Sequence, residues 1–385
     1  MTTGGEALRL RSRVPDGPDV YRFEAAAGVV SPDSFRRAEL LLAEHLWEES
    51  PGRLLCPEAN YGVVATLSGE RADAVRMTES SARAAHLCRR NARRNGVEAD
   101  VTLAADLSGL PDRWDTVAYA PKPYTPLAIG AQHVANALAV LRPGGRLFLA
   151  ASKRTGLARY ERVLAECCGD VERVADAGDW RILRGRRPAS VDPPEYVTPR
   201  TLRPTVNGVD LELVTVPGVF AASGLDGGTR LLLETVGPSL PTDGRILDVC
   251  CGYGAIGAYA AAVSNAAVHL SDDCRFATRC AERGLRETGV DGTVVTADCL
   301  RGVSDRRFDV VLANPPTHAG DSVLSTLFSG VADVLAPDGR FAFVHHRALD
   351  LRDHLEPFDS IERLATGAEH VVFEASRRAG GRLRP

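Results

Sequence analysis

Short apolar runs alternate with amphipathic stretches along the second half of the chain. Strands with helices between them are typical of βαβ units, so we expect an α/β fold with a mainly parallel, doubly wound sheet. A turn at 337–339 is expected to introduce the last strand, and Asn207-Gly208 predicts a tight hairpin. The predicted strands cover residues 245–250, 267–270, 293–296, 308–313 and 340–345, and the predicted helices cover residues 255–263 and 275–288.

The first half of the chain repeats the second. Residues 54–62 align with 246–254 at an offset of 192, and residues 114–117 align with 308–311 at an offset of 194. A repeat of this length indicates a duplicated domain rather than a solenoid, whose period is far shorter. The sequence therefore predicts a domain over residues 1–187, a proline-rich linker over 188–200 and a second domain over 201–385.

Composition fits two globular domains and excludes several other classes of protein. The 385 residues are 44% hydrophobic and 25% charged, and no apolar run is long enough to cross a membrane. Nine cysteines occur without C-x-x-C spacing, which favours neither a disulfide scaffold nor a zinc cluster. We expect a cytoplasmic protein that needs neither a membrane nor a metal.

Basic residues are concentrated in the first half. Residues 1–190 carry 27 basic and 24 acidic side chains, whereas residues 191–385 carry 19 and 26. One predicted helix holds Arg89, Arg90, Arg93 and Arg94, whose like charges repel each other at i,i+4 spacing. RNA phosphate would relieve that repulsion, and so would acidic neighbours from elsewhere in the fold. Both interpretations stay open.

A glycine-containing turn follows the first strand of the second half. Gly252 and Gly254 let the backbone approach a ligand closely, and the next helix offers free N–H groups. Asp248 precedes this turn, Asp272 ends the next strand, and Asp298 follows the third. An acid at the position of Asp272 suits ribose hydroxyls, although aspartates at such turns also cap helices. Together these residues favour a nucleotide-like ligand.

An Asn-Pro-Pro segment follows the strand at 308–313. Pro315 and Pro316 lack an N–H and fix the backbone, so the Asn314 amide oxygen and the Pro315 carbonyl form a rigid pair of acceptors. Such a pair suits an exocyclic amine, whose lone pair would then point at an electrophile. The alternative is a rigid turn that merely ends the strand.

On these motifs the second half resembles a class I S-adenosylmethionine-dependent methyltransferase. More closely, the chain resembles the RsmC/RlmG family of ribosomal RNA guanine-N2 methyltransferases, which have two tandem methyltransferase-like domains with a degenerate first copy. The motifs that carry this resemblance are Gly218–Ala221, Leu225–Leu233 and Asn314–His318. The resemblance implies two tandem Rossmann-like domains that arose by duplication, S-adenosylmethionine as cofactor, and ribosomal RNA or a ribosomal subunit as partner. It does not settle the oligomeric state, and a monomer is compatible with it.

The resemblance also assigns roles to individual residues. Asp248, Cys250, Gly252 and Gly254 would hold the methionine part of the cofactor, Asp272 its ribose and Asp298 its adenine. Asn314 and Pro315 would hold the target amine, in a loop completed by Pro316 and His318. Phe220, Asp226, Thr229 and Thr317 would face the substrate, together with the arginines at 89, 90, 93 and 94.

Two residues depart from the family pattern. Cys250 stands where the family usually has glycine, and Thr317 replaces the aromatic residue expected to stack on the target base. Stacking would then need another ring, for which Phe220 and Tyr253 are the candidates.

The first copy lacks the corresponding chemistry. Cys56 stands at the position of Asp248, Asn60 at that of Gly252 and Ala120 at that of Asn314. We therefore expect this half to be non-catalytic and to contact RNA.

The sequence thus predicts methylation of an exocyclic amine of a nucleobase, above all guanine N2 in ribosomal RNA. Adenine N6, a protein glutamine amide and a small-molecule amine are alternative acceptors. A non-catalytic RNA-binding or assembly factor is the remaining alternative.

Overall fold

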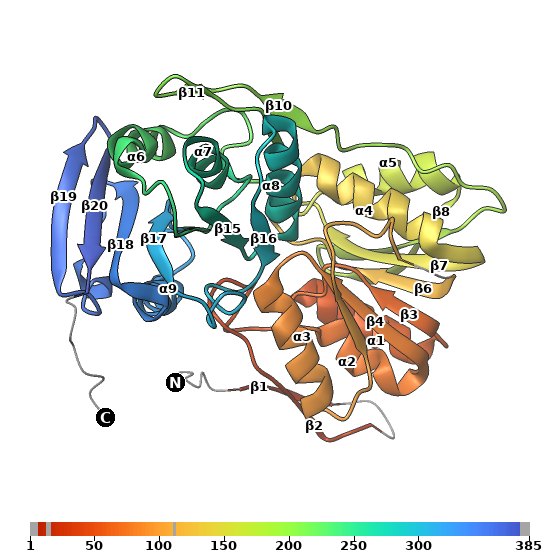
Figure 1. The fold of residues 1–385 in the computed structure, drawn as a ribbon. Helices are drawn as coiled ribbons and strands as arrows, with labels where there is room; N and C mark the ends of the chain where they lie inside the picture. The colour runs from red at the N-terminus through yellow and green to blue at the C-terminus, as the bar shows by residue number, and fades with distance from the viewer. Residues whose placement is uncertain (1–6, 13–16, 111–112, 378–385) are drawn as a thin grey trace. The chain divides into compact units, whose positions relative to one another are not determined.

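The structure, a computed structural model, describes residues 7–12, 17–110 and 113–377. The chain divides into two compact units, residues 1–198 and 199–385, and the division falls inside the stretch predicted as a linker. Each unit has its own sheet and its own core (Figure 1).

The first unit begins with a small hairpin and continues as an α/β layer structure. Its strands are β1 (Leu8–Arg11), β2 (Val20–Phe23), β3 (Gly52–Cys56), β4 (Ala72–Glu79), β5 (Asp100–Leu103), β6 (Trp114–Tyr119), β7 (Leu141–Ser152), β8 (Val171–Ala177) and β9 (Trp180–Arg186). Its helices are α1 (Arg37–Glu48), α2 (Val63–Ser68), α3 (Ala82–Arg94), α4 (Leu127–Val140) and α5 (Leu157–Cys168), with a 3₁₀ turn at Gly69–Arg71.

The second unit has the same plan, and two short antiparallel ribbons precede it in the chain. Its strands are β10 (Arg200–Leu202), β11 (Thr205–Val206), β12 (Val209–Asp210), β13 (Leu213–Thr215), β14 (Arg245–Val249), β15 (Ala267–Asp272), β16 (Thr293–Thr296), β17 (Phe308–Ala313), β18 (Leu335–His346), β19 (Ser360–Thr366) and β20 (His370–Ser376). Its helices are α6 (Gly227–Val236), α7 (Ala255–Val263), α8 (Arg275–Thr288) and α9 (Asp321–Val334), with 3₁₀ turns at Gly237–Ser239 and Arg352–His354.

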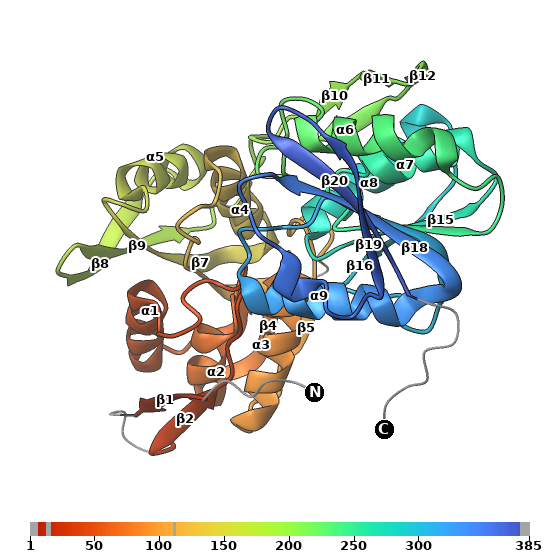
Figure 2. The ribbon, with the colours of Figure 1, turned by 90° about the vertical axis from the view of Figure 1, so that its left-hand side faces the viewer.

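The described residues form one seven-stranded sheet in each unit, and the two sheets have the same topology. The order is β5-β4-β3-β6-β7-β9-β8 in the first unit and β16-β15-β14-β17-β18-β20-β19 in the second. Within these two sheets only β9 and β20 run against the other strands, so their pairings with both neighbours are antiparallel. In the second unit α6, α7 and α8 cover one face of the sheet and α9 covers the other (Figures 1 and 2).

Both faces of the central strands are buried, which explains their nearly continuous apolar sequences. In β14, Ile246 packs into the core beneath α7 and α8, whereas Leu247 packs into the core beneath α9. The first unit divides its core in the same way, with Leu54 and Leu55 on opposite faces. The predicted α/β fold with tandem, mainly parallel sheets is therefore confirmed.

One local prediction was wrong. The turn predicted at 337–339 lies within β18, which begins at Leu335. Leu335 pairs with Phe308 and Arg340 pairs with Val310, so the extra residues form an irregularity in the strand rather than a loop before it. Helices α6 and α9 were also absent from the prediction.

The two units repeat an unusual backbone feature. In the first unit Glu58, Asn60 and Gly62 have φ values of 47°, 61° and 88°; in the second, Cys250, Gly252 and Gly254 have values of 59°, 54° and 85°. Left-handed residues at alternate positions define the turn after the first central strand. The first unit has kept this turn although its side chains differ.

Candidate functional site

The ends of three parallel strands bring the candidate residues together. Val249 of β14 pairs with Ser271 of β15 on one side and with Ala313 of β17 on the other. The glycine turn, Asp272 and Asn314 each lie at or directly after these strand ends, at one edge of the sheet. Ligands bind at this edge in open parallel sheets.

The glycine turn leaves space where a ligand can approach. A Cβ added at Gly252 would have no atom within 4 Å, whereas one added at Gly254 would lie 2.8 Å from Cβ of Ala281. Gly252 therefore keeps the backbone open and Gly254 permits packing against α8. Cys250 adopts a left-handed φ of 59°, a conformation that favours glycine.

Asp248 is a buried carboxylate with one unused oxygen. Its Oδ2 accepts the N–H of Gly257 at 2.8 Å, and its Oδ1 has no hydrogen-bond partner among the described residues. Burial and, to a smaller extent, the nearby carboxylate of Asp272 together raise the pKa of Asp248 to about 8, against the Gly257 hydrogen bond. A buried acceptor without a partner at a ligand-binding edge fits a positively charged or hydrogen-donating ligand.

Asp248→Asn should make the stability of the cofactor-free protein less sensitive to a rise in pH from about 4 to about 8. The folded protein holds the Asp248 proton more tightly than the unfolded chain does, so this residue's contribution to stability falls as pH rises from about 4 to about 8. Asparagine retains an acceptor for Gly257 but cannot ionise. In thermal unfolding of the intact chain without cofactor, the Tm of the variant should therefore exceed that of the wild type by more at pH 8 than at pH 5. If the Tm of the wild type and of the variant changed equally with pH, ionisation of Asp248 would not destabilise the folded protein.

Asp272 lies between two strand ends and accepts two backbone N–H groups. Gly252 donates to its Oδ2 at 2.9 Å, and Cys274 donates to its Oδ1 at 2.8 Å. Burial raises the pKa of Asp272 to about 6, against these two bonds. The structure thus joins Asp272 directly to the glycine turn. Asp298, after β16, lies 3.6 Å from Nε of Arg301.

Hydrogen bonds hold the Asn314 side chain in one orientation. Its Nδ2 donates to Oδ2 of Asp226 at 2.9 Å and to Oγ1 of Thr229 at 3.0 Å. Asp226 caps α6 by accepting the N–H of Thr229 at 2.8 Å. The sequence placed Asp226 and Thr229 among the substrate contacts; in the structure the side chains of both accept from Asn314. The Asn314 oxygen is left for a further donor.

The remaining loop residues contribute less to the observed contacts. The Pro315 carbonyl accepts the N–H of Thr317 at 2.9 Å, so one of its two lone pairs is used within the loop. Pro316 accepts the N–H of Ala319 at 2.9 Å, and His318 is exposed.

Of the two aromatic residues considered for stacking on the target base, Phe220 is accessible and Tyr253 is buried. Phe220 is 58% exposed, whereas Tyr253 is buried and donates its hydroxyl to the Gly224 carbonyl at 3.1 Å. Tyr253 therefore stabilises the loop before α6, and Phe220 remains the candidate for stacking on a base.

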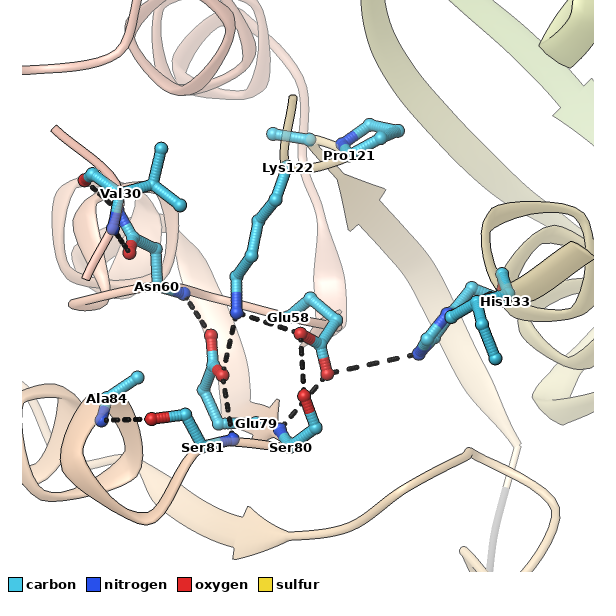
Figure 3. Close-up of polar contacts among 12 residues, drawn as sticks. Val30, Glu58, Asn60, Glu79, Ser80, Ser81, Ala84, Pro121, Lys122 and His133 are labelled. Atoms are coloured by element: carbon cyan, nitrogen blue, oxygen red, sulfur yellow. Dashed lines mark hydrogen bonds and ion pairs between the residues drawn. The ribbon is translucent and has the colours of Figure 1, made fainter. Parts of the chain in front are cut away.

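In the first unit Lys122 stands at the position that corresponds to Pro316 in the repeat, and Figure 3 shows its contacts. The Lys122 ammonium group lies 2.8 Å from Oε2 of Glu58 and 2.9 Å from Oε2 of Glu79. Both carboxylates are buried, and Ser80 donates to Glu58 through its N–H and its hydroxyl, each at 3.0 Å. His133 completes this lysine cluster at 4.0 Å from Oε1 of Glu58.

Two members of the lysine cluster stand at positions that are expected to bind the cofactor in the second unit. Glu58 corresponds to Cys250, and Glu79 lies close to the position of Asp272. Asn60 donates its N–H to Glu79, as Gly252 does to Asp272. The Asn60 side chain is bonded to the backbone of Val30 and is buried. In the first unit the protein's own side chains therefore fill the space around the turn that stays open beside Gly252.

Four of the five arginines of α3, those at 89, 90, 93 and 94, differ in their surroundings. Arg89 donates to the Val101 carbonyl at 2.8 Å, and Arg90 pairs with Glu24 at 2.9 Å. Arg93 and Arg94 are exposed, and no contact to an acid is recorded for either among the described residues. The structure thus gives Arg89 and the exposed Arg90 partners within the unit, and it leaves Arg93 and Arg94 at the surface.

The described ranges contain neither a metal centre nor a membrane-spanning helix. No group of three or more His, Cys, Asp or Glu side chains there could hold a metal ion, and no helix is long and apolar enough to cross a membrane. All nine cysteines are free thiols.

Sequence reasoning missed the lysine cluster and the hydrogen bonds around Asn314. The duplication could have revealed the first, because Lys122 aligns with Pro316 at the offset of 194 and Glu79 falls close to Asp272. The pairing of Asp226 with Asn314 has no local signal, since the two residues are 88 positions apart.

Comparisons with known proteins agree with this geometry. The family model of the methyltransferase small domain matches residues 20–184 and again residues 210–374. The ribosomal RNA small subunit methyltransferase C of Hahella chejuensis is 31% identical over 301 residues, which cover 76% of this chain and 83% of that protein. The protein of the same name from Pseudomonas aeruginosa strain UCBPP-PA14 is 32% identical over 252 residues, 62% and 73% of the two chains.

A solved structure extends the likeness over both units. The 16S rRNA N2 G1207 methyltransferase RsmC of T. thermophilus, in complex with AdoMet and guanosine, superimposes with a TM-score of 0.78 at 25% identity and covers 97% of this chain and 98% of its own. The predicted resemblance is thereby confirmed. The chain belongs to the methyltransferase small domain family and, within it, to the ribosomal RNA small subunit methyltransferase C family.

Proposed function

We propose that the second unit methylates the exocyclic N2 amine of a guanine in ribosomal RNA. The chain is an S-adenosylmethionine-dependent ribosomal RNA methyltransferase by family. The observation that supports an exocyclic amine as the acceptor most directly is the fixed orientation of Asn314, whose nitrogen is engaged by Asp226 and Thr229 while its oxygen can accept an amine hydrogen. The guanosine bound by the T. thermophilus relative agrees with this acceptor.

The residues at the strand ends fit S-adenosylmethionine. The backbone at Gly252 has open space, and Asp248 has a buried oxygen without a partner among the described residues. Asp248, Cys250, Gly252 and Gly254 would hold its methionine part, Asp272 its ribose and Asp298 its adenine. When bound, this cofactor supplies a methyl group on a sulfonium, which is already a good leaving group.

The protein's own contribution to catalysis would be to align the target amine for methyl transfer. The Asn314 oxygen and the free lone pair of the Pro315 carbonyl would accept the two hydrogens of the target amine, and this would direct the nitrogen lone pair away from the loop. Holding the reacting nitrogen in one orientation replaces an improbable encounter in solution. Phe220 would stack on the base in place of an aromatic residue at 317, and the base would have to leave its stack to reach the site.

The first unit would hold RNA without reacting. Glu58 and Glu79 stand at or close to the positions of Cys250 and Asp272 in the repeat, and both pair with Lys122 instead of being open to a cofactor. The exposed Arg93 and Arg94 are the arginines of α3 most accessible to phosphate.

Identifying the methylated nucleoside tests this proposal. The protein is incubated with labelled S-adenosylmethionine and, in separate reactions, with ribosomal RNA, small ribosomal subunits, protein extract and small metabolites. Nuclease digestion of the RNA should yield labelled N2-methylguanosine. Label in N6-methyladenosine, in glutamine or in the metabolite fraction would instead support one of the alternative acceptors.

A further inference from the structure

The orientation of Asn314 follows from the chemistry of its neighbours. A side-chain amide has a donor end and an acceptor end, and a carboxylate can only accept. Oδ2 of Asp226 lies 2.9 Å from one of the two terminal atoms of the Asn314 amide, so that atom must be the nitrogen. The opposite end, which faces away from Asp226, is then the oxygen.

Asp226 at the start of α6 enforces this choice, and Thr229 adds a second contact to the same nitrogen. The Asp226 oxygen that caps the helix also accepts from Asn314, and the buried Thr229 hydroxyl accepts from the same nitrogen. Both hydrogens of the Asn314 amide are therefore engaged. A rotated amide would bring its oxygen against a carboxylate, which is unfavourable.

We propose that Asp226, assisted by Thr229, is a positioning residue that makes the site selective for an amine. It acts through Asn314: by binding the amide nitrogen, it ensures that an acceptor faces the substrate. A substrate edge that carries N–H donors fits this acceptor, whereas a carbonyl edge does not. This inference rests on the proposed function and assigns Asp226 and Thr229 a role other than substrate contact.

Asp226→Ser and Asp226→Asn separate positioning from helix capping. Serine, asparagine and aspartate are comparable N-caps, so both variants should keep α6 and a Tm close to that of the wild type. Asparagine can place its oxygen where Oδ2 of Asp226 lies and keep both contacts. Serine is one atom shorter, so it can cap the helix but cannot also reach Asn314.

We expect Asp226→Ser to lower kcat by about 30-fold and Asp226→Asn by no more than about 3-fold, since a lost hydrogen bond that aligns a reacting group is worth one to two orders of magnitude. The Kd for S-adenosylmethionine should change by less than about 2-fold in both variants, because the Asp226 side chain binds Thr229 and Asn314 rather than the residues proposed to hold the cofactor. Thr229→Val should lower kcat in the same direction. The matched control is Thr235→Val on the same helix, whose hydroxyl donates only to the Leu231 carbonyl at 2.7 Å in the recorded contacts.

Hydrogen exchange tests the orientation of the Asn314 amide without requiring catalysis. In the cofactor-free protein, the side-chain amide hydrogens of Asn314 should exchange slowly with solvent in the wild type and in Asp226→Asn, and quickly in Asp226→Ser. Equal kcat in the two Asp226 variants, or equal exchange, would overturn the inference. If the wild type methylates no RNA, the proposed function fails, while amide exchange still decides whether Asp226 orients Asn314.

Discussion

Replacing Asn314 by alanine should lower methyl transfer by about 1,000-fold or more, since the variant loses the acceptor that aligns the target amine. Cofactor binding should change little, because no recorded contact joins Asn314 to the glycine turn or to Asp272. The measurements are single-turnover methylation of ribosomal RNA and calorimetric titration with S-adenosylmethionine.

Asn265→Ala is the matched control for this substitution. Asn265 is exposed, and its recorded hydrogen bond comes from its backbone rather than its side chain. The control should retain full activity. Loss of cofactor binding together with transfer in Asn314→Ala would mean that the loop is structural, and retained transfer would mean that Asn314 is not the acceptor.

The second large effect concerns stability. Lys122→Met should destabilise the first unit by about 3–5 kcal/mol, because it leaves two buried carboxylates without their cation. Burial raises the pKa of Glu79 to about 7 even with Lys122 present, so the loss should be smaller at low pH, where the carboxylates can be protonated. Differential scanning calorimetry of the intact chain, at pH 5 and pH 8, measures both effects.

The chain supplies its own control, since Lys153 is the other lysine in the sequence and is exposed. Lys153→Met should leave the Tm unchanged. Combining Lys122→Met with Glu58→Gln and Glu79→Gln should recover much of the lost stability, because the buried negative charges are then gone. A Lys122→Met variant as stable as the wild type would show that the lysine cluster is not a stabilising pair of buried ion contacts.

The fold could be predicted because its signals are local or repeated. The apolar run over 245–250 and the amphipathic run over 275–288 each carry their own periodicity, and the offset of 192–194 indicated a second copy. Helix α9 was missed, and the residues at 337–339, expected as a separate turn, form an irregularity within β18.

The site was predictable where backbone chemistry determines it. Gly252 and Gly254 were identified because glycine lets the backbone approach a ligand closely, and Asn314 because two prolines stiffen the segment after it. Contacts between distant residues could not be predicted in this way. Arg90 has a partner in Glu24, and Asn314 has one in Asp226, but nothing in either local sequence indicates the pairing.

Titration of the intact chain with S-adenosylmethionine tests most directly the claim that chemistry belongs to the second unit alone. We expect one binding site per chain, with no site left after Asp272→Arg and an unchanged site after Glu79→Gln. Two sites per chain, or a single site that survives Asp272→Arg, would contradict it.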